Sequence, residues 1–528
     1  MDNKKIKIVS IISIIALALT LVAATYAFFV AQTGEGAQTD IKINANTVDT
    51  FTFEAGSALN LSLNQENFAS GKGNQTGTTF AKAMLSANNK TNTATEHYYL
   101  YLNISNNTFT YSIDNNTPEI LLSIKDGSNN EITTLTGLTY KTVTDGKGAS
   151  IKGFDITKKS GLITILNNRE ITTTSTKTEE WNVTVTFVNY NSNQAGNAGK
   201  NFSAKLMIQK EKIPTVLSDV CTSGNNLASC ITTLSNKSEP SIVNIYHHTS
   251  SLVNGAGDNS YRYAGASDQV NNFVCFGSDA ATCPTDNLYR IIGVINDKVK
   301  LIKYDYMTTD ELGTDGDYSQ TYKEWGMDSA YKGTYGDGER IGAYYWNNDA
   351  GTNTWSRSLL NKTNLNTNFI NYIGTEWSNK IATTTWKVGG NTWTNICIKT
   401  PSVAYTNEIT SPDATNSTDN AIEYSAKIGL MYVSDYGFAA SPEAWTITMS
   451  SYSNTTATNN NWMYMGLYEW TISRDSYGSH SAFFVGSAGH VDRDDVSVDS
   501  GVRASFSLSS STTYVSGSGS MSDPIRVN

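Results

Sequence analysis

Apolar and polar residues alternate through much of residues 35–212. In the segment WNVTVTFVNY, Trp181, Val183, Val185 and Phe187 alternate with Asn and Thr. Because successive side chains of a strand point to opposite faces, a period of two predicts a strand with one buried face. The segments HYYLYLNI, TFTYSI and NFSAKLMIQK repeat the pattern, and Asn- and Gly-rich turns separate them. Short strands at this spacing predict an all-β sandwich over residues 35–212.

A long apolar run precedes this region. Three lysines stand before residues 8–30, which carry no charged residue. As a helix this run would span roughly 35 Å, which is enough to cross a bilayer. Positive charge before the run and none soon after it predicts that the rest of the chain lies outside the cell. The alternative is a signal peptide cleaved before Thr25. Residues 1–34 are therefore predicted to be a transmembrane or signal segment of an exported protein.

The pattern changes after residue 212. Residues 213–259 contain Pro214 and the polar run TTLSNKSEPS, which are typical of a linker. Beyond it, NLYRIIGVINDKVKLIKYDY reads as a hairpin around an Asn296-Asp297 turn. The text from TWSRSLL to WSNKI has apolar residues every three or four positions, which predicts a helix, and KIGLMYVSDYGF predicts another strand. This mixture predicts an α+β domain over residues 260–528.

Five cysteines occur in the chain. Cys221 and Cys230 are close in sequence, as are Cys275 and Cys283, so each pair predicts a short-loop disulfide of an exported protein. Cys397 is left over. The alternative is that all five are free thiols. No CxxC pair occurs, so a zinc site is not expected.

Residues 475–500, called the ribbon from here on, have a restricted polar alphabet. They contain no Lys, Glu, Gln, Met or Trp, although the residues just before them contain Trp, Met and Glu. Apolar residues such as Phe484, Val491 and Val496 recur between the polar ones. This pattern predicts buried apolar side chains below an adaptable polar surface. The candidate ligand-binding residues are Asp475, Tyr477, His480, Phe483, His490, Asp492, Arg493 and Asp494. The alternative is a polar hairpin surface without a binding role.

Two arginines frame the ribbon. Arg474 precedes it directly, and Arg503 follows it within the segment GVRAS. Their position at both edges favours structural roles, with Glu469 or Asp499 as carboxylate partners.

Four segments occur in a distinctive order: TWSRSLLN, LMYVS, WTISR and GVRAS. Together they resemble a bacterial domain of unassigned activity, which is similar to the C-type-lectin-like fold of sulfatase-modifying formylglycine enzymes. The chain departs from that pattern at Thr471-Ile472 and at Ala504, where proline is usual. The resemblance implies a C-type-lectin-like fold for residues 260–528. The oxidase activity of those enzymes uses a cysteine pair that the shared segments of this chain lack, so the resemblance does not extend to catalysis.

The same domain is similar to receptors that are diversified by reverse transcription. In those receptors, randomised asparagine codons cannot produce Lys, Glu, Gln, Met or Trp. The ribbon obeys this restriction. The resemblance therefore implies a binding surface on the ribbon that is open to genetic diversification.

The N-terminal part resembles a second group of proteins. The apolar run ends in ATYAFFVAQT and leads directly into the strand-rich region, as in the camelysin/TasA-like exported proteins of Gram-positive bacteria. Those proteins are surface or biofilm-fibre subunits. This resemblance implies an alternative function, a structural fibre or biofilm-matrix subunit that polymerises through the β-sandwich.

The charge and the histidines of the chain argue against nucleic-acid binding and against a metal site. The net charge is −10, and no basic stripe occurs, so nucleic acid is not an expected partner. His480 and His490 with Asp492 or Asp494 lack the spacing of a metal site. We therefore expect no catalytic residues, metal or cofactor. The sequence predicts an exported bacterial surface protein that binds an unknown protein or glycan, and that contacts the membrane where its N-terminal helix is retained.

Overall fold

The computed structural model describes residues 49–64, 67, 71–88, 92–322, 330–335, 340–348, 352–413, 422–453 and 455–528. The chain divides into two compact units, with the boundary between Lys212 and Ile213. The predicted transmembrane or signal segment, residues 1–34, lies outside the described residues. Within the described ranges, no helix has both the length and the apolar character needed to cross a membrane.

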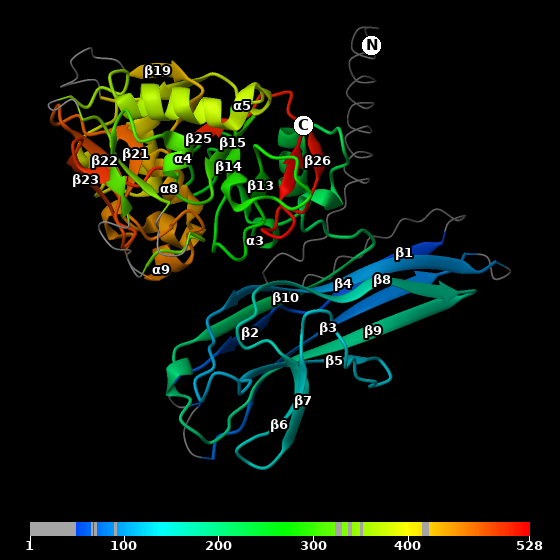
Figure 1. Ribbon diagram of the computed structural model, residues 1–528. Coiled ribbons are helices and arrows are strands. Elements are labelled where there is room, and N and C mark those ends of the chain that lie inside the picture. The colour runs from blue at the N-terminus through cyan, green and yellow to red at the C-terminus, as the bar shows by residue number, and fades with distance from the viewer. Residues whose placement is uncertain are drawn as a thin grey trace, which may run out of the picture. The chain divides into compact units, whose positions relative to one another are not determined.

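The described residues of the first unit form two antiparallel sheets, which appear in Figure 1 as two layers of blue to green strands. One sheet has the strand order β1 (Thr50–Ala55), β3 (Gln75–Ser86), β9 (Thr176–Phe187), β5 (Ile120–Asp126), β7 (Ser150–Asp155) and β6 (Tyr140–Thr144). The other has the order β2 (Leu59–Ser62), β10 (Asn201–Gln209), β4 (Ala94–Asn107) and β8 (Gly161–Thr173). A short helical turn, η2 (Ala195–Asn197), precedes β10.

The core of this unit lies between the two sheets. Val183, Val185 and Phe187 on β9 are each 0% exposed. Burial of such a side chain stabilises the fold by about 1.5–3 kcal/mol. A polar link also joins the layers, because the Trp181 Nε1–H donates to the Tyr98 hydroxyl at 2.9 Å. The buried alternate positions confirm the predicted β-sandwich.

A sheet of nine described strands forms the centre of the second unit. Its main path runs through β20 (Ile428–Gly429), β25 (Ser505–Ser507), β15 (Lys298–Lys303), β14 (Leu288–Ile295), β13 (Phe273–Cys275), β27 (Ile525–Val527) and β26 (Tyr514–Ser516). Two further strands, β12 (Tyr261–Tyr263) and β11 (Ile245–His247), join it through β14. The β13–β27 pair is parallel, so the end of the chain is built into the sheet.

The predicted hairpin is present as β14 and β15. Asn296 and Asp297 have φ values of 50° and 58°. Positive φ at both central residues is the signature of a type I′ turn, whose twist matches that of the flanking strands. Asn and Asp tolerate this left-handed region better than most residues, so this local sequence specifies the turn.

Smaller elements surround the central sheet. Further strands are β16 (Tyr318–Thr321), β17 (Gly342–Tyr345), β18 (Thr384–Lys387), β19 (Glu423–Ala426), β21 (Glu469–Arg474), β22 (Ser481–Val485), β23 (Val491–Asp495) and β24 (Asp499–Ser500). Helices are α2 (Leu227–Lys237), α3 (Pro240–Val243), α4 (Thr309–Leu312), α5 (Ile370–Ser378), α6 (Trp393–Ile396), α7 (Pro401–Tyr405), α8 (Val433–Ala439) and α9 (Thr455–Asn459). The 3₁₀ helices are η3 (Leu217–Asp219), η4 (Thr285–Asn287), η8 (Pro442–Thr446) and η9 (Met449–Ser451). The π-helices are η6 (Leu360–Phe369) and η7 (Thr406–Thr410).

One helix of the second unit was expected from the sequence, and another lies where a strand was expected. The predicted helix is present as η6, a π-helix, which continues directly into α5. The segment KIGLMYVSDYGF was predicted to be a strand, but only β20 pairs, and α8 begins at Val433. Asp435 Oδ2 accepts a hydrogen bond from the backbone N–H of Tyr432 at 3.0 Å. This cap satisfies a backbone donor at the start of a helix and therefore favours helix over strand.

Residues 213–259 differ from the linker prediction, because they belong to the second unit. Leu227, Ile231 and Leu234 on α2 are 0–3% exposed and pack in the core of that unit. Asn226 caps α2 by accepting from the backbone N–H of Ser229 at 3.0 Å. The strand β11 then pairs with β12 of the central sheet. The segment is therefore packed structure, and one of its polar residues, His248, is itself 0% exposed.

All five cysteines lie within the described residues. Disulfides join Cys221 to Cys230 and Cys275 to Cys283, as predicted. Cys397 is a buried free thiol. Structural disulfides persist in oxidising compartments, so the pairing is typical of a protein outside the cytosol.

Candidate functional site

The ribbon is organised by a three-stranded antiparallel sheet of β21, β22 and β23, which Figure 1 shows at the left edge of the second unit. Strand β22 lies in the middle. Trp470 on β21 and Asp492 on β23 both face Phe484 in the register. The ribbon therefore starts after β21, forms a hairpin and returns towards β24.

A buried apolar layer fixes the ribbon from below. Phe483, Val491 and Val496 are each 0% exposed, and Trp470 is 1% exposed. The turn between β22 and β23 requires glycine at residue 489, where φ is +94° and an added Cβ would lie 2.6 Å from a methyl carbon of Thr458. Apolar side chains are therefore packed below the ribbon, as expected from the recurring valines and phenylalanines.

Asn353 holds the first turn of the ribbon. Its side-chain amide donates to three backbone carbonyls, those of Asp475 at 2.9 Å, Gly478 at 3.0 Å and Ser481 at 2.8 Å. Asn353 itself is 1% exposed. These bonds fix a turn that carries exposed side chains. Sequence reasoning missed this residue, although it stands directly before the shared segment TWSRSLLN.

A buried ion pair closes the base of the ribbon. The Arg503 guanidinium donates to both carboxylate oxygens of Glu469, at 2.8 and 2.9 Å. It also donates to the Met463 carbonyl at 2.7 Å. Arg503 and Glu469 are 1% and 2% exposed, so the pair is fully desolvated. Of the two predicted partners, Glu469 is thus the residue that Arg503 uses.

Glu408 connects β21, the strand that precedes the ribbon, to α8. Its carboxylate accepts from the backbone N–H groups of Val433 and Ser434 at 2.9 and 3.0 Å. It also accepts from the hydroxyls of Ser434 and Ser473. Burial raises the pKa of Glu408, while these donors oppose that rise. The carboxylate thus holds β21 against the start of α8.

Two of the eight candidate residues are buried. Asp475 is 1% exposed and Phe483 is 0% exposed, so neither offers its side chain to a ligand. Phe483 belongs to the apolar layer. Asp475 forms an ion pair with Arg493 and accepts from the Tyr477 backbone N–H at 3.0 Å. Both residues are therefore supports of the ribbon.

The other six candidates reach the surface. Tyr477 is 75% exposed. Further exposed or half-buried candidates are His480, His490, Asp492, Arg493 and Asp494. The Arg493 guanidinium lies 5.8 Å from the centre of the Tyr477 ring. Arg493 thus connects the first turn to β23 while part of its side chain remains at the surface.

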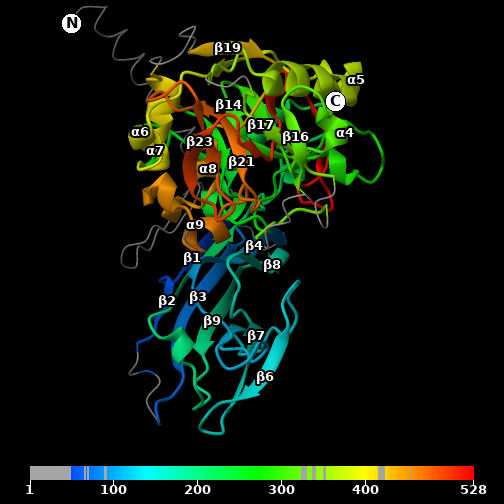
Figure 2. The ribbon, with the colours of Figure 1, turned by 60° about the vertical axis from the view of Figure 1, so that its left-hand side comes forward.

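Asp492 links β23 to α6, which lies beside β23 in Figure 2. The indole N–H of Trp393 donates to Asp492 Oδ1 at 2.6 Å. Nearby, burial and the charges of Asp492 and Asp475 raise the pKa of the Cys397 thiol well above its usual range. A thiol of this kind is neutral and inert at neutral pH.

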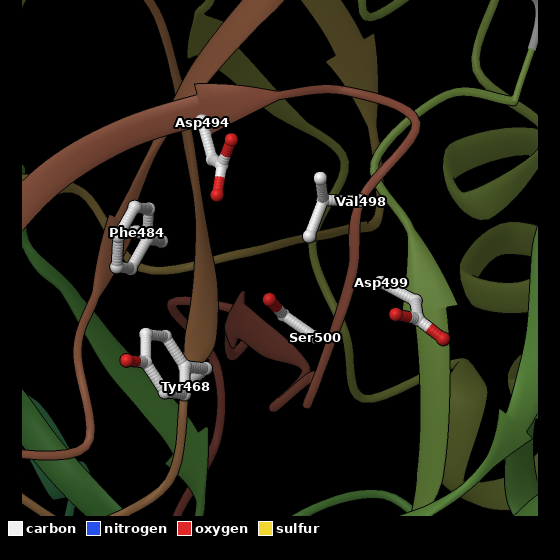
Figure 3. Close-up of a pocket in the computed structure, with 6 residues that line it drawn as sticks. All are labelled: Tyr468, Phe484, Asp494, Val498, Asp499 and Ser500. Atoms are coloured by element: carbon white, nitrogen blue, oxygen red, sulfur yellow. The ribbon is translucent and has the colours of Figure 1, made fainter. Parts of the chain in front are cut away.

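A pocket of about 330 Å³ opens within the ribbon, between strands β22 and β23 and the ribbon's end at β24 (Figure 3). The described residues that line it are Tyr468, Phe484, Asp494, Val498, Asp499 and Ser500. The ring centres of Tyr468 and Phe484 are 5.6 Å apart. Of the sequence-predicted candidates, only Asp494 lines it.

No protein-family model and no curated protein sequence matches this chain. Within the described ranges, no group of three or more His, Cys, Asp and Glu side chains is arranged to hold a metal ion. The geometry consists of a buried frame, an exposed polar surface and an adjoining pocket, and such an arrangement can bind a ligand without covalent chemistry.

Proposed function

We propose that this chain is an exported bacterial surface protein, and that its second unit binds a protein or glycan ligand through the ribbon. In this proposal the second unit is a C-type-lectin-like head. Binding is non-covalent and uses Tyr477, His480, His490, Arg493 and Asp494.

The division of the ribbon into a buried, hydrogen-bonded base and exposed side chains carries the proposal. Asn353, Glu408 and the Glu469–Arg503 pair hold the strands from below. Tyr477 remains 75% exposed on top of this frame. Rigid exposed aromatic groups give contact area at a low cost in conformational entropy, which is why they are frequent in binding surfaces.

The test uses the full-length chain, purified in a non-ionic detergent and applied to a glycan array and a displayed peptide library. The double variant Tyr477→Ala/His480→Ala removes two exposed side chains and leaves Asn353, Glu408 and the Glu469–Arg503 pair in place. Tyr372→Ala is the matched control, since Tyr372 is a 43% exposed tyrosine on α5. We expect saturable binding that falls about tenfold or more in the double variant and persists in the control. Absence of saturable binding, or binding that the double variant leaves intact, would overturn the proposal.

A second candidate function is a fibre subunit that polymerises through the β-sandwich. Edge strand β8 is 13 residues long and pairs on one side with β4. Exposed edges of this kind can pair with another chain. However, Arg169 and Glu170 lie on β8, and charged edge residues oppose such pairing. Ordered fibres of the full-length chain in electron micrographs would favour this function, and monomers with saturable ligand binding would favour the ribbon.

A further inference from the structure

The pocket of the ribbon is lined by aromatic, aliphatic and acidic side chains. Its aromatic side is formed by Tyr468 and Phe484 and its aliphatic side by Val498, while Asp494 adds a carboxylate. Tyr468 and Val498 are 44% and 40% exposed, so the pocket opens to solvent. The described lining residues include two aspartates and neither lysine nor arginine.

Two oxygen acceptors lie at the centre of this pocket. Figure 3 shows the Asp494 carboxylate and the Ser500 hydroxyl pointing into the space beside the two rings. The Asp494 Oδ1 atom accepts from the Asp495 backbone N–H at 2.8 Å, which leaves Oδ2 for a ligand. Ser500 is only 3% exposed, and among the described residues none makes a hydrogen bond with its hydroxyl. The residue is thus mostly enclosed, while its hydroxyl faces the pocket and can bond to a ligand there.

Asp499 acts on the pocket differently. Its Oδ2 atom accepts from the Gln320 side-chain amide at 3.2 Å, and Figure 3 shows the carboxylate turned away from the central space. Asp499 therefore adds negative charge at the rim of the pocket, while Asp494 and Ser500 are the residues that can contact a ligand directly. The local field therefore favours a positive ligand group.

We propose that this pocket binds the alkylammonium group of a lysine side chain on a polypeptide partner. The ammonium donates to Asp494 and Ser500, its charge lies against the rings of Tyr468 and Phe484, and its methylene chain packs on Val498. A volume of about 330 Å³ is near the lower end of ligand sites, and it suits one side chain better than an oligosaccharide. A compact ammonium also fits two single acceptors better than the planar fork of a guanidinium.

This inference rests on the proposed function, because it names the partner chemistry of the same surface. Its test is separate, since Tyr477 and His480 are not among the lining residues. Suppose that a ligand no longer binds the Tyr477→Ala/His480→Ala variant but still binds variants of the pocket. This result would support the proposed function and contradict the assignment of the pocket.

The experiment measures binding of Nα-acetyl-lysine N-methylamide to the full-length chain in a non-ionic detergent by ligand-observed NMR. The norleucine analogue is the neutral control, and the arginine analogue tests the shape of the cation. We expect a dissociation constant in the millimolar range for lysine, about tenfold weaker binding of norleucine, and weakening at high salt. Equal binding of lysine and norleucine, tighter binding of arginine, or no lysine binding would each overturn the proposal.

Three variants localise the effect. Asp494→Asn keeps the shape and removes the charge, so lysine binding should weaken about fivefold or more. Val498→Lys places a cation of the chain's own at the rim and should abolish binding by competition. Asp268→Asn makes the same change in net charge at an exposed position of the second unit that does not line the pocket, and should change nothing. An Asp494→Asn protein that binds lysine as well as the unaltered chain would contradict the assignment.

Discussion

The guanidinium of Arg493, at the surface of β23, forms an ion pair with the buried carboxylate of Asp475. The Arg493 side chain is 36% exposed and that of Asp475 only 1%. The two residues belong to different parts of the ribbon, the first turn and strand β23. The pair therefore fixes the turn that carries Tyr477 to the strand that carries Asp494.

Removal of Arg493 should leave Asp475 buried without its cation. We expect Arg493→Met to lower the free energy of unfolding of the second unit by about 2 kcal/mol. The double variant Arg493→Met/Asp475→Asn should recover about half of this loss, because an amide can still accept from the Tyr477 backbone. Urea unfolding followed by tryptophan fluorescence measures both. The control Lys387→Met breaks an exposed pair with Glu423 and should cost less than about 1 kcal/mol.

Loss of the arginine should lower the free energy of unfolding more in the Glu469–Arg503 pair than in the Asp475–Arg493 pair, because both partners of the former are buried. Arg503→Met leaves a desolvated carboxylate and removes the bond to the Met463 carbonyl. We expect a loss of about 3–5 kcal/mol in the same unfolding experiment. Arg340→Met is the matched control, since its pair with Asp286 is partly exposed and should contribute about 1 kcal/mol or less. Equal losses in the two variants would contradict this account of the ribbon base.

We expect His248 to make the stability of the second unit depend on pH. The residue is 0% exposed, and its Nδ1 accepts from the Ala256 backbone N–H at 3.0 Å. Burial, with the nearby charge of Arg262, lowers the pKa of His248 to about 3. Between this value and the usual pKa of about 6.5, the unfolded chain binds a proton that the folded chain does not. Stability should therefore fall as the pH falls below about 6.5.

The size of this effect can be isolated with one variant. A single group contributes up to about 1.4 kcal/mol for each pH unit in that window. His248→Asn keeps an acceptor for the Ala256 N–H and cannot titrate. We expect its unfolding free energy to depend less steeply on pH between about 5 and 6.5 than that of the unaltered chain. Identical slopes for the two proteins would show that His248 does not cause the dependence.

Local patterns in the sequence predicted the parts of the fold that local physics controls. The alternation around Val183 places one face of β9 in the core, and the Asn296-Asp297 pair specifies the type I′ turn. The cysteine pairs could be predicted because their loops are short. In each case the residues that decide the structure are neighbours in the chain.

Predictions that depend on distant residues did less well. Asp475 is a charged residue in a polar segment, which predicts a contact residue, but its carboxylate is buried and forms an ion pair with Arg493. The local pattern of residues 213–259 is typical of a linker. Their apolar side chains nevertheless pack against core residues that stand up to hundreds of positions later in the chain. Asn353 gave no local signal, since its three partners lie in the ribbon. Such pairings are set by tertiary packing, which composition and period do not encode.

The state of the cysteines allows a direct chemical test of the second unit. Cys397 is 0% exposed, and burial holds its pKa well above the usual range, so iodoacetamide should not modify it in the folded chain. Unfolding without reductant should expose this one thiol, and unfolding with reductant should expose all five cysteines. Intact mass spectrometry counts the adducts, and Cys397→Ser should lose the single adduct. An adduct on the native chain, or several adducts without reductant, would contradict the disulfide assignment and the burial of Cys397 together.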